Sequence, residues 1–174
     1  MGLPYHTAMQ LEMIWNLHGR EFGKIAQKLL ALSFVDMGFR LAEERAVQGV
    51  DIDVVNDEGG EKLSIEVKTS MGSKVSIGKK DLEGLESRRR NDGYRPYFAF
   101  LFKPHCLGDG WMLVPAANIG EGDSHAMRLA GKVDAELTAR VNAAFPGVVE
   151  RILDDLLDCP EGQALGMLRE KHGI

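Results

Sequence analysis

The chain has 174 residues and a formal net charge of −5, with 44% hydrophobic and 27% charged residues. This length can bury the core of one domain, and the composition is that of an ordinary globular protein rather than a disordered one. The sequence shows no apolar run long enough for a membrane span and no signal segment at its start. We therefore expect a cytoplasmic protein with no membrane contact, in which Cys106 and Cys159 are free thiols.

The first strong helical pattern runs from about residue 20 to residue 36, with a broad apolar face suited to packing on a sheet. Met37-Gly38 supplies the glycine that commonly ends a helix. Glu21 lies in the first turn, where a carboxylate complements the helix dipole. A first strand is expected over residues 39–46, followed by a loop at Gln48-Gly49.

Two runs of alternating apolar and polar residues follow, over residues 49–55 and 63–70. Alternation with period two is typical of half-buried strands, because successive side chains point to opposite faces. The polar, glycine-containing segment between the runs predicts a turn. The sequence therefore predicts a β-hairpin at this point.

The turn decides which residues of the hairpin face one another. If Glu58-Gly59 forms the loop, Asp51 lies opposite Glu66. If Gly59-Gly60 forms it, Asp51 lies opposite Lys68. Either register gathers the same charged side chains on one face of the hairpin: Asp51, Asp53, Glu66 and Lys68.

This charged face has two explanations, and the pattern alone leaves both open. The face could be solvated and carry a weak ion pair between Glu66 and Lys68. Alternatively, the dense β-branched residues around it indicate a sheet covered on both sides, and carboxylates that point inward there repel each other and resist losing water. A divalent cation such as Mg²⁺ would stabilise them, with Lys68 beside the metal.

The segment after the hairpin is basic, although the chain as a whole is acidic. Residues 74–103 contain eight basic and four acidic side chains, a local charge of +4. A flexible polar loop over residues 69–74, a short edge strand near 75–77 and a helix over about 78–91 are expected there. Such a segment suits contact with phosphates, and its candidate DNA contacts are Lys74, Lys79, Lys80, Arg88, Arg89 and Arg90.

The rest of the chain shows no catalytic pattern. Residues 95–102 form an aromatic run that predicts a strand whose rings belong to the core, and residues 111–115 predict a last strand. Beyond residue 118, helical patterns cover about 124–144, 148–158 and 161–172, interrupted by Pro146-Gly147 and Pro160. These helices could form a cap, a dimerisation surface or a docking site for a protein partner.

Asp51 followed by Glu66-Val67-Lys68 on the next strand resembles the PD-(D/E)xK nucleases, with Val50 at the place of the proline. From Gly19 to Phe102, the order of helix, Gly-Phe strand, acidic hairpin, helix and strand is most similar to the archaeal Holliday junction resolvases. The resemblance implies an α/β fold of the restriction-endonuclease-like kind, with a mixed sheet of about five strands between helices. It divides the chain into a nuclease domain, residues 1–117, and a helical extension, residues 118–174.

The resemblance also implies roles for individual residues. Asp51 and Glu66 would hold Mg²⁺ or Mn²⁺, with the Val67 carbonyl and Glu21 as further ligands, and Lys68 would act on the attacking water or the phosphate. Asp53 would support these groups from the same face. Near Gln48 the relatives have a catalytic serine and basic residues, for which this chain offers only Arg45 and Gln48.

The function implied is metal-dependent cleavage of DNA, selective for junctions and carried out by a homodimer. Two alternatives are a restriction or defence endonuclease that cuts duplex DNA, and a non-catalytic DNA-binding or interaction module with the same fold. Loss of an acidic ligand or of the lysine would mark the non-catalytic module, whereas Asp51, Glu66 and Lys68 are all present.

Overall fold

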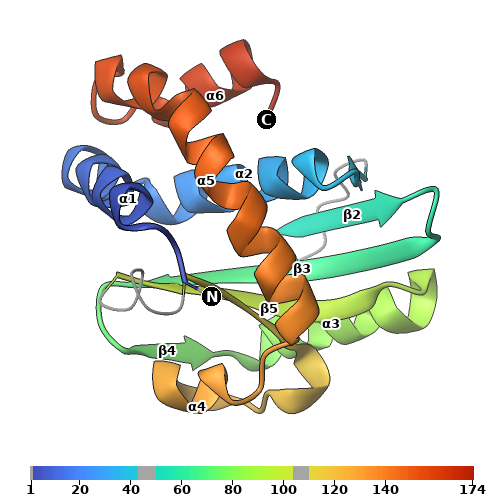
Figure 1. Ribbon diagram of the computed structural model, residues 1–174. Coiled ribbons are helices and arrows are strands. Elements are labelled where there is room, and N and C mark those ends of the chain that lie inside the picture. Colours follow the sequence, from blue (N-terminus) through green and yellow to red (C-terminus); the bar gives the residue numbers. More distant parts are fainter. Residues whose placement is uncertain (1, 43–49, 104–109) are drawn as a thin grey trace.

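The computed structural model describes residues 2–42, 50–103 and 110–174 of the chain. A central sheet lies between a layer of helices on one face and a mixed layer on the other (Figure 1). The predicted mixed α/β sheet between helices, with further helices toward the C-terminal end, is confirmed. Residues 43–46, half of the strand expected over 39–46 and including Arg45, lie outside the described residues, as does Gln48.

The central sheet has five strands in the order β1-β2-β3-β5-β6. β3 runs parallel to β5, and the other neighbouring pairs are antiparallel. β2 pairs with β3 only as far as Ile65, so the second half of β3 extends beyond β2. The strands are β1 (Arg40–Leu41), β2 (Ile52–Asn56), β3 (Glu61–Ser70), β5 (Arg95–Phe102) and β6 (Trp111–Pro115).

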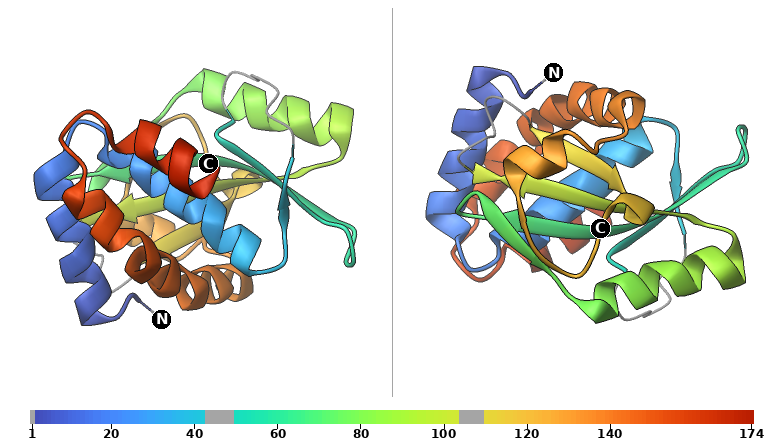
Figure 2. Two further views of the ribbon diagram at one scale, coloured as in Figure 1. Left: turned by 90° about the horizontal axis from the view of Figure 1, so that it is seen from above. Right: turned by 90° about the horizontal axis from the view of Figure 1, so that it is seen from below.

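Helices cover one face of this sheet, as the view from above in Figure 2 shows. Their apolar sides share one core cluster with residues of the sheet such as Ile65 and Tyr97. None of the helices within the described ranges has the length and apolar character that crossing a membrane requires. These helices are α1 (Tyr5–His18), α2 (Phe22–Asp36), α5 (Ala135–Asp158) and α6 (Ala164–His172).

The opposite face carries a second core cluster. Phe98, Phe100 and Phe102 alternate along β5 with residues of the first cluster, so this strand is buried on both sides and its aromatic residues are core, as predicted. The elements over this face are β4 (Lys74–Ile77), α3 (Lys79–Asp92), η2 (Ala116–Asn118), β7 (Gly122–His125) and α4 (Ala126–Ala130).

Two expectations about secondary structure require correction. The first helical pattern was expected to begin at about residue 124, but residues 122–125 form the strand β7. This strand pairs with the short strand β4 in a separate two-stranded sheet. Pro146 does not interrupt the chain, because α5 continues through it from Ala135 to Asp158. An interior proline costs about 3 kcal/mol. The apolar face of α5 is buried both before and after Pro146, at Phe145 and Val148, so core packing outweighs that cost.

Candidate active site

The hairpin adopts the register in which Asp51 lies opposite Glu66. Ile52 pairs with Ile65 and Asp53 with Ser64, which makes Glu58-Gly59 the centre of the loop. One step before the strand, the Asp51 N–H donates to the Ile65 carbonyl at 3.0 Å. The Val67 N–H in turn donates to Asp51 Oδ2 at 2.9 Å. Asp51 is therefore fixed by main-chain groups at the point where β3 extends beyond β2.

The charged face of the hairpin is buried at Glu66 and partly exposed at Lys68. Its neighbours across β3 and β5 are Phe98 and Phe100, which pair with Glu66 and Lys68 and belong to the second core cluster. Glu66 is 7% exposed. The first explanation offered by the sequence, a solvated face, is therefore wrong for Glu66, and this carboxyl group lies in an interior where a charge needs a specific partner.

Burial of Glu66 raises its pKa from an ordinary value of 4.5 to about 7, and the nearby charge of Asp51 adds to this rise, against the hydrogen bond from Lys68. With a pKa of about 7, Glu66 is protonated in part of the molecules at neutral pH. A divalent cation would displace that proton, because it compensates both carboxylates at once.

Lys68 lies between two carboxylates. Its Nζ is 3.0 Å from Glu66 Oε1 and 2.7 Å from Asp81 Oδ2. Burial lowers the pKa of Lys68, but the bonds to Asp81 and Glu66 outweigh burial and raise it above its usual value. Lys68 is therefore a protonated hydrogen-bond donor at neutral pH.

Asp81 is a member of this site that the sequence analysis did not select. It is the third residue of α3, where Oδ2 also accepts a hydrogen bond at 3.0 Å from the N–H of Gly78. Burial raises the pKa of Asp81, but the bonds from Lys68 and Gly78 outweigh it and leave the pKa below the usual range. The capping position was a usable sequence signal, since an acidic residue three positions after a helix start is expected to point back toward it.

Helix α2 also reaches Asp51. Lys24 Nζ lies 3.3 Å from Asp51 Oδ1, and Gln27 Nε2 donates to the Asp51 carbonyl at 3.0 Å. Both residues were missed, although they lie one turn and nearly two turns beyond Glu21 on the helix. Helical spacing alone could have grouped Glu21 with Lys24.

Glu21 lies at the start of α2, where its Oε2 accepts a hydrogen bond at 3.1 Å from the N–H of Gly162. The same oxygen is 4.0 Å from Nδ1 of the buried His18. Among the described residues, no hydrogen bond joins Glu21 to Asp51 or Glu66. Its role as a ligand stays a prediction.

Asp53 belongs to a neighbouring network rather than to the site itself. It accepts a hydrogen bond at 2.6 Å from Ser64 Oγ and forms an ion pair with Arg88. Arg88 also contacts Asp92 Oδ2 at 2.5 Å, and its guanidinium lies 4.4 Å from the centre of the Tyr94 ring. At 5% exposed, Arg88 does not have the accessible position that a DNA contact requires, because α3 turns it inward toward the hairpin.

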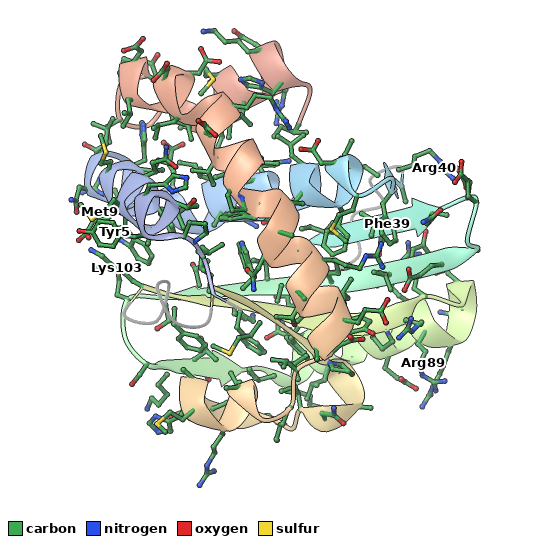
Figure 3. The ribbon with its side chains drawn as sticks, viewed as in Figure 1. Tyr5, Met9, Phe39, Arg40, Arg89 and Lys103 are labelled. Carbon is green, nitrogen blue, oxygen red and sulfur yellow. The ribbon has the colours of Figure 1, made fainter. Side chains whose placement is uncertain are left out.

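The other predicted DNA contacts are exposed. Arg89 and Arg90 share Glu86 at 2.7 and 2.6 Å, and Figure 3 shows Arg89 pointing away from the sheet. Lys74 pairs with Asp123 at 2.7 Å, and Lys79 lies 3.5 Å from Glu83. Lys80 is exposed on the first turn of α3. The positions of these residues allow DNA contact, which remains a prediction.

The donor set at Asp51 and Glu66 fits a hard divalent cation. Within the described part of the chain no group of three or more His, Cys, Asp or Glu side chains is arranged to hold a metal ion. Two carboxylates with a main-chain carbonyl and water are nonetheless a sufficient set for Mg²⁺, which binds few protein ligands and keeps several waters. The carbonyl of Val67, the residue after Glu66, stays the predicted main-chain ligand.

Comparison with known proteins shows which family the chain resembles in sequence and in fold. Residues 22–144 match the model of the archaeal Holliday junction resolvase (Hjc) family. The structure is also similar to that of Archaeoglobus fulgidus Hjc, a Holliday junction resolvase from an archaeal hyperthermophile, with a TM-score of 0.54 and 18% sequence identity. That similarity covers 67% of this chain and 95% of the archaeal one. No curated protein matches the chain.

Proposed function

Because the chain belongs to the archaeal Holliday junction resolvase family, a family of nucleases with the PD-(D/E)xK fold, we propose that it is a metal-dependent endonuclease that cuts four-way DNA junctions. One observation carries this proposal: Asp51 lies opposite Glu66, which is buried, with Lys68 bonded to Glu66 at 3.0 Å. A scaffold without catalytic function would have no need to hold two acidic groups together, one of them, Glu66, with a raised pKa.

Asp51, Glu66 and the Val67 carbonyl would hold the cation, Mg²⁺ or Mn²⁺. When bound, such an ion lowers the pKa of a water molecule and offsets charge that builds on the phosphate. Lys68 is protonated, so it donates hydrogen bonds to the attacking water or to a phosphate oxygen rather than removing a proton. Asp81 holds the Lys68 ammonium in place at 2.7 Å.

Glu21 would join the ligand set only by giving up its hydrogen bond from Gly162. A homodimer would supply two sites for the two strands that must be cut in one junction, and the exposed basic residues after the hairpin would contact the phosphates. We propose a cytoplasmic location and leave the helical extension, residues 118–174, as a candidate surface for a protein partner.

The proposal is tested by Mg²⁺-dependent cleavage of a panel of substrates: a four-way junction, linear duplex, single-stranded DNA and supercoiled plasmid. Asp51→Asn and Lys68→Ala are compared with the wild type, and Asp57→Asn serves as a control because Asp57 lies in the exposed hairpin turn and pairs only with Arg40 among the described residues. We expect metal-dependent cutting of the junction, its loss in the two site variants and its retention in the control.

Preferred cutting of linear duplex would instead indicate a restriction or defence endonuclease. Absence of cutting on every substrate, with DNA binding equal in the wild type and both site variants, would contradict the nuclease and indicate a binding module. The oligomeric state is measured by light scattering with and without junction DNA, and a monomer in both conditions would contradict the homodimer.

A further inference from the structure

Lys24 lies at a position where an α-helix disfavours a positive charge. It is the third residue of α2, and the dipole of the helix favours acidic side chains in the first turn. The preceding residue, Gly23, lies close to β3, because a Cβ atom at Gly23 would be 3.2 Å from Thr69 Oγ1. The main chain at Lys24 is therefore held beside the strand that carries Lys68.

The ammonium group of Lys24 contacts one of the two carboxylate oxygens of Asp51. Oδ2 accepts the hydrogen bond from the Val67 N–H at 2.9 Å, and Oδ1 is 3.3 Å from Lys24 Nζ. Lys24 Nζ also donates to Gln27 Oε1 at 3.0 Å, and Gln27 Nε2 donates to the Asp51 carbonyl at 3.0 Å. Lys24 and Gln27 thus form a closed set of contacts with Asp51.

Lys24 and Lys68 both contact carboxylates of the site, but they are held differently. Lys68 Nζ contacts Glu66 and Asp81 at 3.0 and 2.7 Å, and its side chain is 24% exposed. Lys24 contacts one carboxylate at 3.3 Å, and its side chain is 63% exposed. An exposed ion pair of this kind contributes little stability, so it is easily exchanged for another partner. Lys68 is therefore fixed in place, whereas Lys24 is able to leave.

The oxygen that Lys24 contacts is the one that a divalent cation would use. Oδ2 of Asp51 is bonded to the main chain, which leaves Oδ1 as the better ligand. Mg²⁺ binds its oxygen ligands at about 2.0–2.1 Å. An ammonium group 3.3 Å from the same oxygen would then lie close to a doubly positive ion, and the two cations repel each other. Metal binding therefore favours the departure of Lys24 from Asp51.

The displaced ammonium group needs an anionic partner outside Asp51. A lysine has a flexible four-carbon chain, and most of the Lys24 side chain is exposed to solvent. The phosphates of a bound DNA strand are the anions that a nuclease brings to this position, and lysine is a common contact for them.

We propose that Lys24 is the counter-ion of Asp51 in the metal-free protein, and that the divalent cation displaces it to contact a phosphate of the bound DNA. The proposal rests on the proposed nuclease function. Lys24 is thereby a DNA-binding residue in the metal-loaded protein alone. Metal and DNA then bind cooperatively through this lysine, and each raises the affinity for the other by the same factor.

The first test measures metal affinity without DNA. Mn²⁺ is titrated into metal-free protein, and the unbound ion is followed by electron paramagnetic resonance, with Asp51→Asn to define uptake outside the site. Lys24→Ala is compared with Lys24→Arg, which keeps the charge, and with Lys171→Ala as a matched control. Lys171 is 57% exposed and pairs with Asp155 at 2.6 Å on the helical extension. Thermal unfolding shows that each variant is folded.

We expect Lys24→Ala to bind Mn²⁺ about three- to tenfold more tightly than the wild type, because a competing cation is gone. Lys24→Arg and Lys171→Ala should stay close to the wild-type value. Equal Mn²⁺ affinity in Lys24→Ala and the wild type would overturn the competition at Asp51, as would equal tightening in Lys171→Ala. Equal Mn²⁺ uptake by the wild type and Asp51→Asn would overturn it too.

The second test measures binding of a fluorescein-labelled four-way junction over a range of salt, once without divalent metal and once with Ca²⁺, which also takes oxygen ligands. Without metal, Lys24→Ala should bind the junction as the wild type does. With Ca²⁺ it should bind about three- to tenfold more weakly, and the slope of log Kd against log salt should fall by about 1.

The two conditions separate a released lysine from a fixed one. An equal loss of junction binding with and without Ca²⁺ would mean a permanent phosphate contact and would overturn the release of Lys24. Unchanged junction binding in both conditions would overturn the phosphate contact. Absence of Mg²⁺-dependent cleavage by the wild type would contradict the proposed function instead, and the Mn²⁺ titration, which needs no cleavage, would still decide whether Lys24 competes for Asp51.

Discussion

Two charged networks lie side by side on the same face of the hairpin, and each connects the hairpin to α3. In the first, which we call the catalytic network after its proposed role, Lys68 joins Glu66 to Asp81. In the second, the anchoring network, Arg88 joins Asp53 to Asp92. The lysine side chain is 24% exposed and the Arg88 side chain 6%. The two networks thus have similar components and different access to solvent.

The difference lies in how the charges are balanced. The planar guanidinium of Arg88 contacts two carboxylates and a tyrosine ring, which compensates its burial. In the catalytic network Glu66 faces the charge of Asp51, and the pKa of Glu66 is raised to about 7 by burial and by that charge. The compensated charges of the anchoring network hold α3 to the hairpin. The incompletely compensated Glu66 beside the partly exposed Lys68 is the site that we propose to bind a cation and a phosphate.

The largest expected effect separates the two networks by activity. Lys68→Ala should lower the single-turnover rate of junction cleavage by about 10²- to 10⁴-fold, because it removes a positioned donor from the reacting phosphate. Its loss of thermal stability should be smaller than that of Arg88→Ala, because Glu66 has a raised pKa of about 7 and can take up a proton once Lys68 is gone. A variant that cleaves within tenfold of the wild type would contradict this assignment.

The next effect is on stability. Arg88→Ala should lower the free energy of unfolding by about 3 to 5 kcal/mol, because it leaves Asp53 in the interior without its charged partner. The measurement is urea denaturation of the metal-free protein. Asp53→Asn combined with Arg88→Met should recover much of the loss, since it removes both charges and keeps an acceptor for Ser64. A double variant less stable than Arg88→Ala would argue against this explanation.

A smaller effect is expected from the titration of Glu66. Between its ordinary pKa of 4.5 and its folded value of about 7, the folded protein binds more protons than the unfolded chain. The free energy of unfolding of the metal-free protein should therefore fall as pH rises through this window, by on the order of 1 to 3 kcal/mol. Glu66→Gln has no such proton and should flatten the decline.

Glu58→Gln is the control for this measurement, because Glu58 lies exposed in the hairpin turn. Urea denaturation at a series of pH values that spans the ordinary and the folded pKa of Glu66 provides the comparison. Equal pH dependence in the wild type and Glu66→Gln would show that another group is responsible.

The smallest expected effect concerns the exposed arginines of α3. Arg89→Ala and Arg90→Ala should each weaken junction binding only a few-fold and lower the salt slope by about 1 or less, because each is already paired with Glu86. Neither should change the free energy of unfolding as Arg88→Ala does. Anisotropy titrations at several salt concentrations measure the binding, and urea denaturation measures the free energy of unfolding. A stability loss in Arg89→Ala equal to that in Arg88→Ala would contradict the assignment of Arg88 alone as the anchoring arginine.

The hairpin is predictable from the sequence because its information is local. Alternation with period two is enough to assign Asp51, Glu66 and Lys68 to one face, and the turn limits the register to two possibilities. The choice between those registers is not available from the sequence, because adjacent glycines offer nearly equivalent turns. The core position of the aromatic residues in 95–102 is equally local and is confirmed.

Contacts between distant segments are not predictable in the same way. Asp81 meets Lys68 only because α3 packs across the sheet, and Gln27 meets Asp51 only because α2 packs on the other side. The three consecutive arginines look alike in sequence, although Arg88 follows the buried Leu85 at helical spacing and could have been assigned inward on that ground. The prediction at Pro146 was wrong because local propensity was weighed without the continuous core contact of α5.

Helix α3 reaches both networks, with Asp81 near its start and Arg88 seven residues later. Seven residues are close to two full helical turns, so both side chains leave the helix on the same side, about 10 Å apart along its axis. The helix therefore fixes the distance between its contact with Lys68, through Asp81, and its contact with Asp53, through Arg88. Inserting one residue between them would rotate one contact by about 100° relative to the other. Across related sequences, α3 should thus vary in composition at its exposed positions and keep the number of residues between its two contacts.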